Sequence, residues 1–216
     1  LLASSAASDV YKRQDMIMKL LLTGFEPWNS HINPSWEAVK LTPDRVEGIK
    51  IEKLMLPVSA QRAVPLLKER MDAIVPDAVI CTGQDGRKQA ITIERIAINL
   101  DDYRVPDNDG IIIKDRKIVA DGPDAYFSTL PVRRMLDAIM ACGVPAVLSY
   151  TAGTHLCNHV MYSALHLAAN VLPGTIAGFI HVPLDISQCQ DATRGGCFMD
   201  IESTVKGLVA AIGALY

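Results

Sequence analysis

The sequence lacks the features that mark three large classes of protein. It contains no run of about 18 apolar residues, so we expect no membrane-spanning helix. Its 21 Lys and Arg residues stand against 24 Asp and Glu, and the net charge of −3 argues against a dedicated nucleic-acid-binding protein. The five cysteines are odd in number and lack the dense spacing of a secreted, disulfide-stabilised domain. These absences predict a soluble protein of a reducing, cytoplasmic setting.

Several motifs of cofactor-dependent and metal-dependent proteins are also missing. The segment TGQDGRK at 82–88 departs from the phosphate-binding patterns GxxxxGKS and GxxxxGKT. No GxGxxG follows a predicted strand, and the zinc motif HExxH is absent. We therefore expect neither a cofactor nor a resident metal.

The chain shows no internal repeat, linker or low-complexity segment, and 216 residues suffice for one domain with a sizeable core. Its first 15 residues, LLASSAASDVYKRQD, contain no Met and no long apolar core of a signal peptide. We interpret residues 1–15 as a non-native or disordered leader and residues 16–216 as the folded domain.

Strand-like apolar runs alternate with helical patterns through this domain. We expect buried strands at 19–23, 50–57, 78–82, 145–150 and 175–182, and helices at 33–40, 60–74, 131–143, 157–170 and 201–216. The alternation predicts an α/β fold, a single-domain α/β/α open, mostly parallel twisted sheet with helices on both faces. Between Ile91 and Asn99 the apolar positions change parity, which predicts a bulge or sharp twist near Glu94 and Arg95.

Cys157 is the strongest chemical candidate, because it lies where an apolar strand gives way to a helix. The positive end of a helix dipole and nearby amides stabilise a thiolate there. His181 ends the next strand, and a parallel neighbouring strand would place it at the same sheet edge, where it can exchange protons with the thiol and a leaving amine. Glu94 can orient the imidazole and stabilise its cation. The alternatives are a buried apolar Cys157, a core His181, and a Glu94 that is ion-paired with Arg95 or another basic residue.

A second pattern points to metal chemistry. His155 and His159 are spaced i, i+4 and can share one helix face, as in a metal-dependent hydrolase. A non-catalytic binding protein on the same fold is a third possibility.

Six segments occur in an order that adds a more specific signal. They are TGFEPW and NPS within 23–35, GQ and ITIERIAIN within 83–99, RVPDN at 104–108, AYFSTLP at 125–131, SYTAGTHLCN at 149–158 and GFIHVP at 178–183. With these segments the chain resembles the pyroglutamyl-peptidase I family, also called pyrrolidone-carboxylate peptidase, from Met18 to the C-terminal helix. The resemblance implies a cytoplasmic cysteine peptidase that removes an N-terminal pyroglutamyl residue from peptides through a thioester. It also implies a homo-oligomer, commonly a tetramer.

The resemblance assigns residues to roles. The family's catalytic triad maps onto Glu94, Cys157 and His181. Its substrate-binding positions map onto Phe25, Trp28, Asn33, Gln84, Arg104, Val105, His155 and Leu156. Aromatic faces can sandwich a flat lactam ring, while side-chain amides or the backbone satisfy its N–H and C=O groups.

This chain also departs from the family pattern. Trp28-Asn29-Ser30 stands where the family usually has a second Phe followed by two Gly, in a loop that is one residue shorter. His155 takes a position often held by a large apolar or aromatic residue. Residues 184–199 do not follow the familiar pattern, so no lid or assembly role is carried over to them.

Overall fold

The computed structural model describes residues 17–190 and 198–216, so the predicted leader at 1–15 lies outside the described residues. The predicted strands and helices are present, with small differences at their ends. In chain order they are β1 Lys19–Phe25, α2 Pro34–Leu41, β2 Arg45–Val46, β3 Ile49–Leu56, α3 Ala63–Ile74, β4 Ala78–Gln84, β5 Ile91–Glu94, β6 Ile96–Ile98, β7 Ala125–Phe127, α4 Val132–Ala141, β8 Ala146–Ser149, α5 Leu156–Asn170, β9 Ile176–Val182, the 3-10 helix η1 Ile186–Gln190 and α6 Ile201–Gly213. Within the described part of the chain, no helix is both long and apolar enough to cross a membrane.

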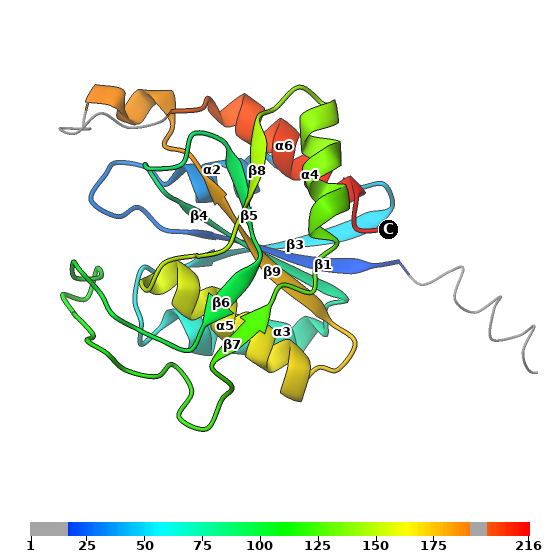
Figure 1. The fold of residues 1–216 in the computed structure, drawn as a ribbon. Helices are drawn as coiled ribbons and strands as arrows, with labels where there is room; N and C mark the ends of the chain where they lie inside the picture. Colours follow the sequence, from blue (N-terminus) through cyan, green and yellow to red (C-terminus); the bar gives the residue numbers. More distant parts are fainter. Residues whose placement is uncertain (1–16, 191–197) are drawn as a thin grey trace, which may run out of the picture.

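The main sheet has the strand order β2-β3-β1-β4-β9-β5-β8 (Figure 1). Strands β3, β1, β4 and β9 run parallel to one another. Strands β5 and β8 are parallel to each other but antiparallel to β9, and the short β2 is antiparallel at the other edge. The predicted open, mostly parallel sheet is therefore confirmed. The strand before α5 is nevertheless not a parallel neighbour of β9, because β5 lies between them.

Helices cover both faces of this sheet, as predicted. Figure 1 shows α2, α4 and α6 on one face and α3 and α5 on the other. The alternation of β1 explains the two layers, because successive side chains of a strand point to opposite faces. Leu20 and Leu22 belong to the core under α2, α4 and α6, whereas Leu21 packs in the core under α3 and α5.

The parity change after Ile91 has a different cause from the predicted bulge. Strand β5 ends at Glu94, and after Arg95 the chain enters β6, which pairs with β7 in a separate two-stranded antiparallel sheet. The alternation restarts because Ile96 and Ile98 belong to that second sheet. The prediction of a bulge within one strand is therefore wrong, and the change of sheet leaves Glu94 as the last residue of β5.

Candidate active site

Glu94 and His181 meet across the β5–β9 pair. Glu94 lies opposite Phe179, and His181 is two residues further along β9, so both side chains point to the face covered by α5. His181 Nδ1 is 2.8 Å from Glu94 Oε1, and both residues are almost fully buried. Because an ionised carboxylate only accepts hydrogen bonds, Nδ1 is the donor here. The other ring nitrogen, Nε2, is left to exchange a proton with a nucleophile.

Cys157 reaches the same place from the first turn of α5. Its Sγ atom lies over Gly83 of β4, the residue paired with His181 in the parallel register. A Cβ atom on Gly83 would stand 3.0 Å from this Sγ and 2.9 Å from Phe179 Cζ. Residue 83 must therefore lack a side chain for the sulfur to sit beside His181. The first amides of a helix have no partner within it, so α5 also offers N–H donors near the sulfur.

The surroundings of His181 favour its protonated form. Burial by itself lowers the pKa of His181, but attraction and hydrogen bonding to Cys157, and then to Glu94, outweigh it and raise this pKa to about 9. The imidazole is thus protonated at neutral pH. The other cysteine beneath the site, Cys81, is fully buried, and burial raises its pKa to about 12. Cys81 therefore remains a neutral thiol.

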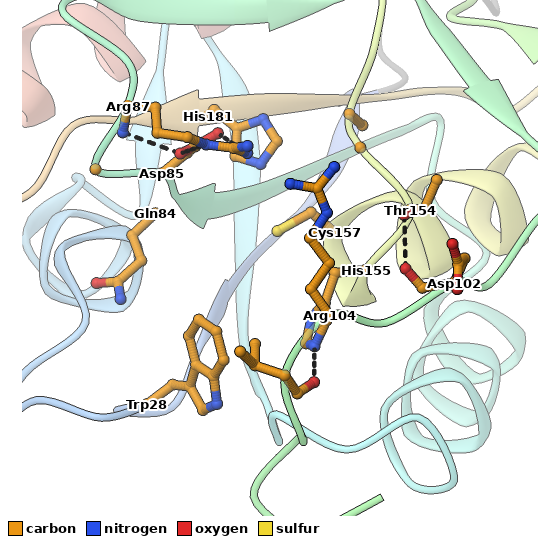
Figure 2. A pocket seen from close by; sticks show the side chains of 14 residues that line it. Trp28, Gln84, Asp85, Arg87, Asp102, Arg104, Thr154, His155, Cys157 and His181 are labelled. Atoms are coloured by element: carbon orange, nitrogen blue, oxygen red, sulfur yellow. Dashed lines mark hydrogen bonds and ion pairs between the residues drawn. The ribbon is translucent and has the colours of Figure 1, made fainter. Parts of the chain in front are cut away.

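Cys157 and His181 open onto a cleft of about 450 Å³, which Arg104 and Val105 also line. Figure 2 shows Trp28 and Gln84 on one side of this cleft and Asp102 and Thr154 on the other. A smaller recess of about 50 Å³ adjoins it and is lined by Phe25, Trp28, Asn33, Val58, Gln84, His155, Leu156 and Cys157. The structure thus brings all eight predicted substrate-binding residues to the cleft or its recess.

An aromatic wall borders the recess. The ring of His155 contacts those of Trp28 and Tyr103, with centroid distances of 5.4 and 4.1 Å. His155 Nε2 is 3.1 Å from the Val105 carbonyl oxygen and donates to it, because a carbonyl can only accept. Burial lowers the pKa of His155, so this imidazole is neutral at neutral pH. A histidine can therefore replace a larger apolar ring here without adding charge to the wall.

Comparison with known proteins supports the resemblance to pyroglutamyl peptidases. The family model described as pyroglutamyl peptidase matches residues 18–216. The chain belongs to the pyroglutamyl peptidase family. It is 45% identical over 199 residues to a pyrrolidone-carboxylate peptidase of Streptococcus suis, covering 92% of each chain. It is 43% identical over 198 residues to one of Alkaliphilus oremlandii, covering 91% of this chain and 92% of the relative.

Solved structures of the same family have the same fold as this chain. Pyroglutamyl peptidase I from Bacillus amyloliquefaciens superposes with a TM-score of 0.88 at 37% identity, over 93% of this chain and 96% of the other. A variant of pyrrolidone carboxyl peptidase from Pyrococcus furiosus gives a TM-score of 0.88 at 37% identity, over 92% and 98%. The predictions of family, fold class and cysteine-type peptidase are confirmed.

In this member of the pyroglutamyl peptidase family, the side-chain amide of Asn33 forms hydrogen bonds within the protein. Its Oδ1 accepts from the Ser35 amide at 3.1 Å and caps α2, and its Nδ2 donates to the Glu26 carbonyl at 3.0 Å. The amide of Asn33 thus fixes the loop that carries Trp28, while Gln84 is the more exposed amide of the recess.

Gln188 of η1 is a buried residue of the site region that the sequence did not single out. Its Nε2 donates to Ser30 Oγ at 2.9 Å and approaches Gln84 Oε1 at 3.4 Å. The segment after β9 therefore supports the loop beside the recess. No motif signals this role, because it depends on two loops that are distant in the sequence.

The two histidines of the predicted metal cluster have separate protein partners. His155 is held by Val105 and its ring neighbours, whereas His159 Nδ1 lies 2.8 Å from Asp101 Oδ2. Among residues 17–190 and 198–216, no group of three or more His, Cys, Asp or Glu side chains is arranged to hold a metal ion. The absence of such a group from the described residues does not favour the metal-dependent alternative.

Hydrogen bonds fasten the start of α5 to the segment at 98–105. Besides the contacts of His155 and His159, Thr154 Oγ1 donates to the Asp102 carbonyl at 2.8 Å. Asn158 Nδ2 donates to the carbonyls of Ile98 and Leu100 at 2.9 and 3.0 Å, and its Oδ1 accepts from the Ile98 amide at 2.9 Å. The segment that carries Arg104 and the helix that carries Cys157 thus form one wall of the cleft.

Proposed function

We propose that this chain hydrolyses the amide bond that follows an N-terminal pyroglutamyl residue, with Cys157 as nucleophile, His181 as acid and base, and Glu94 as the group that orients His181. The observation that carries the proposal is the buried contact of 2.8 Å between His181 and Glu94, beside a cysteine that opens onto a cleft. Membership of the pyroglutamyl peptidase family supports the substrate class.

The reaction divides into two steps around a thioester. In the first step the Cys157 thiolate attacks the pyroglutamyl carbonyl carbon, and amides of the first turn of α5 stabilise the oxyanion. The carbon–nitrogen bond then breaks as His181 gives its proton to the leaving amine. In the second step His181 takes a proton from water, the hydroxide oxygen attacks the thioester, and pyroglutamate leaves as the sulfur regains its negative charge.

The recess supports recognition of a neutral ring. Phe25, Trp28 and His155 supply ring surfaces, and Gln84 supplies an amide for the lactam N–H and C=O groups. None of the residues that line the recess is acidic. A glutamyl or glutaminyl residue would bring an ammonium group that loses its water without gaining a partner. We therefore expect strong discrimination in favour of pyroglutamyl substrates.

We further propose a cytoplasmic homotetramer with one peptidase domain over residues 16–216. The family resemblance and the cysteine usage support this proposal. Large apolar side chains that are exposed in the single chain, such as Phe127 and Tyr150, are candidates for burial between subunits. Light scattering after size-exclusion chromatography measures the number of subunits directly.

The proposed activity is tested with a fluorogenic amide of pyroglutamate and the matching glutaminyl amide. We expect the parent protein to release the fluorophore only from the pyroglutamyl amide, in the presence of a metal chelator as well as without it. Cys157→Ser should be inactive, because oxygen is a far weaker nucleophile in this setting. Cys142→Ser is the matched control, since Cys142 is also a partly buried free cysteine.

Three results would contradict the proposal. Turnover by Cys157→Ser would remove the sulfur from the mechanism. Loss of activity in the chelator would favour the metal-dependent alternative. A folded parent protein that binds the pyroglutamyl amide without cleaving it would favour the binding-protein alternative.

A further inference from the structure

Lys88, in the loop between β4 and β5, makes a contact with the proposed triad. Its Nζ is 3.3 Å from Glu94 Oε1, the same oxygen that accepts from His181. The Lys88 side chain is 21% exposed, and its ammonium also donates to Ser149 Oγ on β8 at 3.3 Å. Among the described residues, Lys88 is the only Lys or Arg within ion-pair distance of Glu94.

Glu94 needs such a partner because its carboxylate is fully buried. Its relative exposure is 0%, and its Oε2 has no hydrogen-bond partner within the described residues. Removing a carboxylate from water is unfavourable by several kcal/mol unless a nearby opposite charge compensates. The imidazolium of His181 does not suffice, because it also faces Cys157, which is a thiolate in the proposed mechanism. Glu94, His181 and Cys157 together carry a net charge of −1 in their active form.

We propose that Lys88 is a positioning residue for the peptidase reaction, which keeps Glu94 ionised and thereby preserves the thiolate–imidazolium pair of Cys157 and His181 at neutral pH. The inference rests on the proposed function of these three residues. Lys88, Glu94, His181 and Cys157 then form a row of alternating charges whose sum is zero. Lys88 touches neither the substrate nor the reacting atoms, so its effect passes through Glu94.

The remaining charged groups around the row do not replace Lys88. In the loop after β4, Asp85 interacts electrostatically with His181 and Arg87 with Cys157, but the two also pair with each other through a contact of 2.9 Å and neither contacts Glu94. Arg104 lines the same cleft but forms no ion pair with a described residue. Strand β8 contributes Ser149, which is uncharged. Arg95 follows Glu94 in the chain, and its guanidinium lies 6.0 Å from the centroid of the Phe127 ring, over the second sheet.

The test measures thiolate formation at Cys157 without using the peptidase activity. Parent, Lys88→Met and Lys88→Arg proteins are alkylated with iodoacetamide over a range of pH, and the rate is followed on the chymotryptic peptide 151–162, whose only cysteine is Cys157. Without Lys88 the three remaining groups carry a net negative charge, so they take up a proton at higher pH. The pH below which the alkylation rate falls, the acidic limb of the profile, should therefore be higher by about 1 pH unit in Lys88→Met.

Lys53→Met is the matched control, because the Lys53 side chain is 20% exposed and also pairs with a carboxylate, Asp44, away from the site. We expect Lys88→Arg and Lys53→Met to keep the parent alkylation profile. Lys88→Met should unfold cooperatively but at a lower temperature than the parent, because it leaves the buried Glu94 without its cation. The acidic limb of kcat/KM should move with the alkylation limb in Lys88→Met.

Two outcomes would overturn the inference. One is a parent-like alkylation limb in Lys88→Met. The other is an equal shift in Lys88→Arg, which would show that the shape of Lys88 matters rather than its charge. A parent protein that shows the expected alkylation limbs but cleaves no pyroglutamyl amide would contradict the proposed function and leave the role of Lys88 standing.

Discussion

Replacing Cys157 by Ser should lower the pKa of His181, because the charge that raises it lies mainly on the sulfur. Burial alone lowers this pKa, while Cys157 and then Glu94 raise it, from an ordinary value of 6.5 to about 9. Cys157 precedes Glu94 among the causes that raise this pKa, so the substitution removes the leading cause of the rise. We expect a fall of at least about 1 pH unit, equal to ~1.4 kcal/mol less stabilisation of the imidazolium.

A histidine NMR titration measures this change. The chain has five histidines, and the signal of His181 is identified by its disappearance in His181→Ala. In the parent protein this signal should titrate near pH 9, and kcat/KM should fall above that pH as the imidazolium loses its proton. In Cys157→Ser the titration should move to lower pH. A midpoint near 9 in Cys157→Ser, or near 6.5 in the parent, would refute the ion pair.

Other substitutions test the remaining parts of the site. Glu94→Gln keeps a hydrogen-bond acceptor but removes the negative charge, so kcat should fall about 10²-fold, against about 10³-fold or more for His181→Ala. Equal losses would contradict an orienting role. Trp28→Ala should raise KM about tenfold with little change in kcat, and an unchanged KM would exclude ring contact. Gly83→Ala should displace the Cys157 sulfur and lower kcat about 10²-fold in a folded protein, and parent-like turnover would show that the sulfur tolerates the added methyl.

Much of the fold could be predicted from sequence because burial leaves a periodic pattern. The runs at 19–23 and 78–82 are apolar on both faces, as expected for strands covered by helices on each side. The choice of neighbouring strands and their direction leaves no such periodic pattern in the sequence. Nothing in the residues of β5 and β8 indicates that they run antiparallel to β9, and the parity change after Glu94 is equally compatible with a bulge and a change of sheet.

The proposed catalytic residues could be predicted from the sequence for a related reason. Cys157 and His181 are reactive groups placed where a helix begins and a strand ends, and such places gather at one region of an α/β sheet. Lys88 and Gln188 carry no comparable signal. Each acts through one contact with a residue far away in the chain, and charged or amide residues in a loop are usually solvated. Tyr103 is similar, because its ring contact with His155 depends on how two segments cross.

The hydrogen bonds between the start of α5 and residues 98–105 also affect the entropy of binding. Ordering one backbone residue costs roughly 1–2 kcal/mol in conformational entropy, and a wall that is ordered before the ligand arrives avoids that cost on binding. Trp28 is held in a similar way, since its Nε1 donates to the Pro106 carbonyl at 3.3 Å. A five-membered lactam has few atoms with which to offset disorder in its site. The folding free energy of the domain therefore keeps the recess ordered before the ligand binds. A variant that loses one of these hydrogen bonds should bind the ligand more weakly, although all its contacts to the ligand remain.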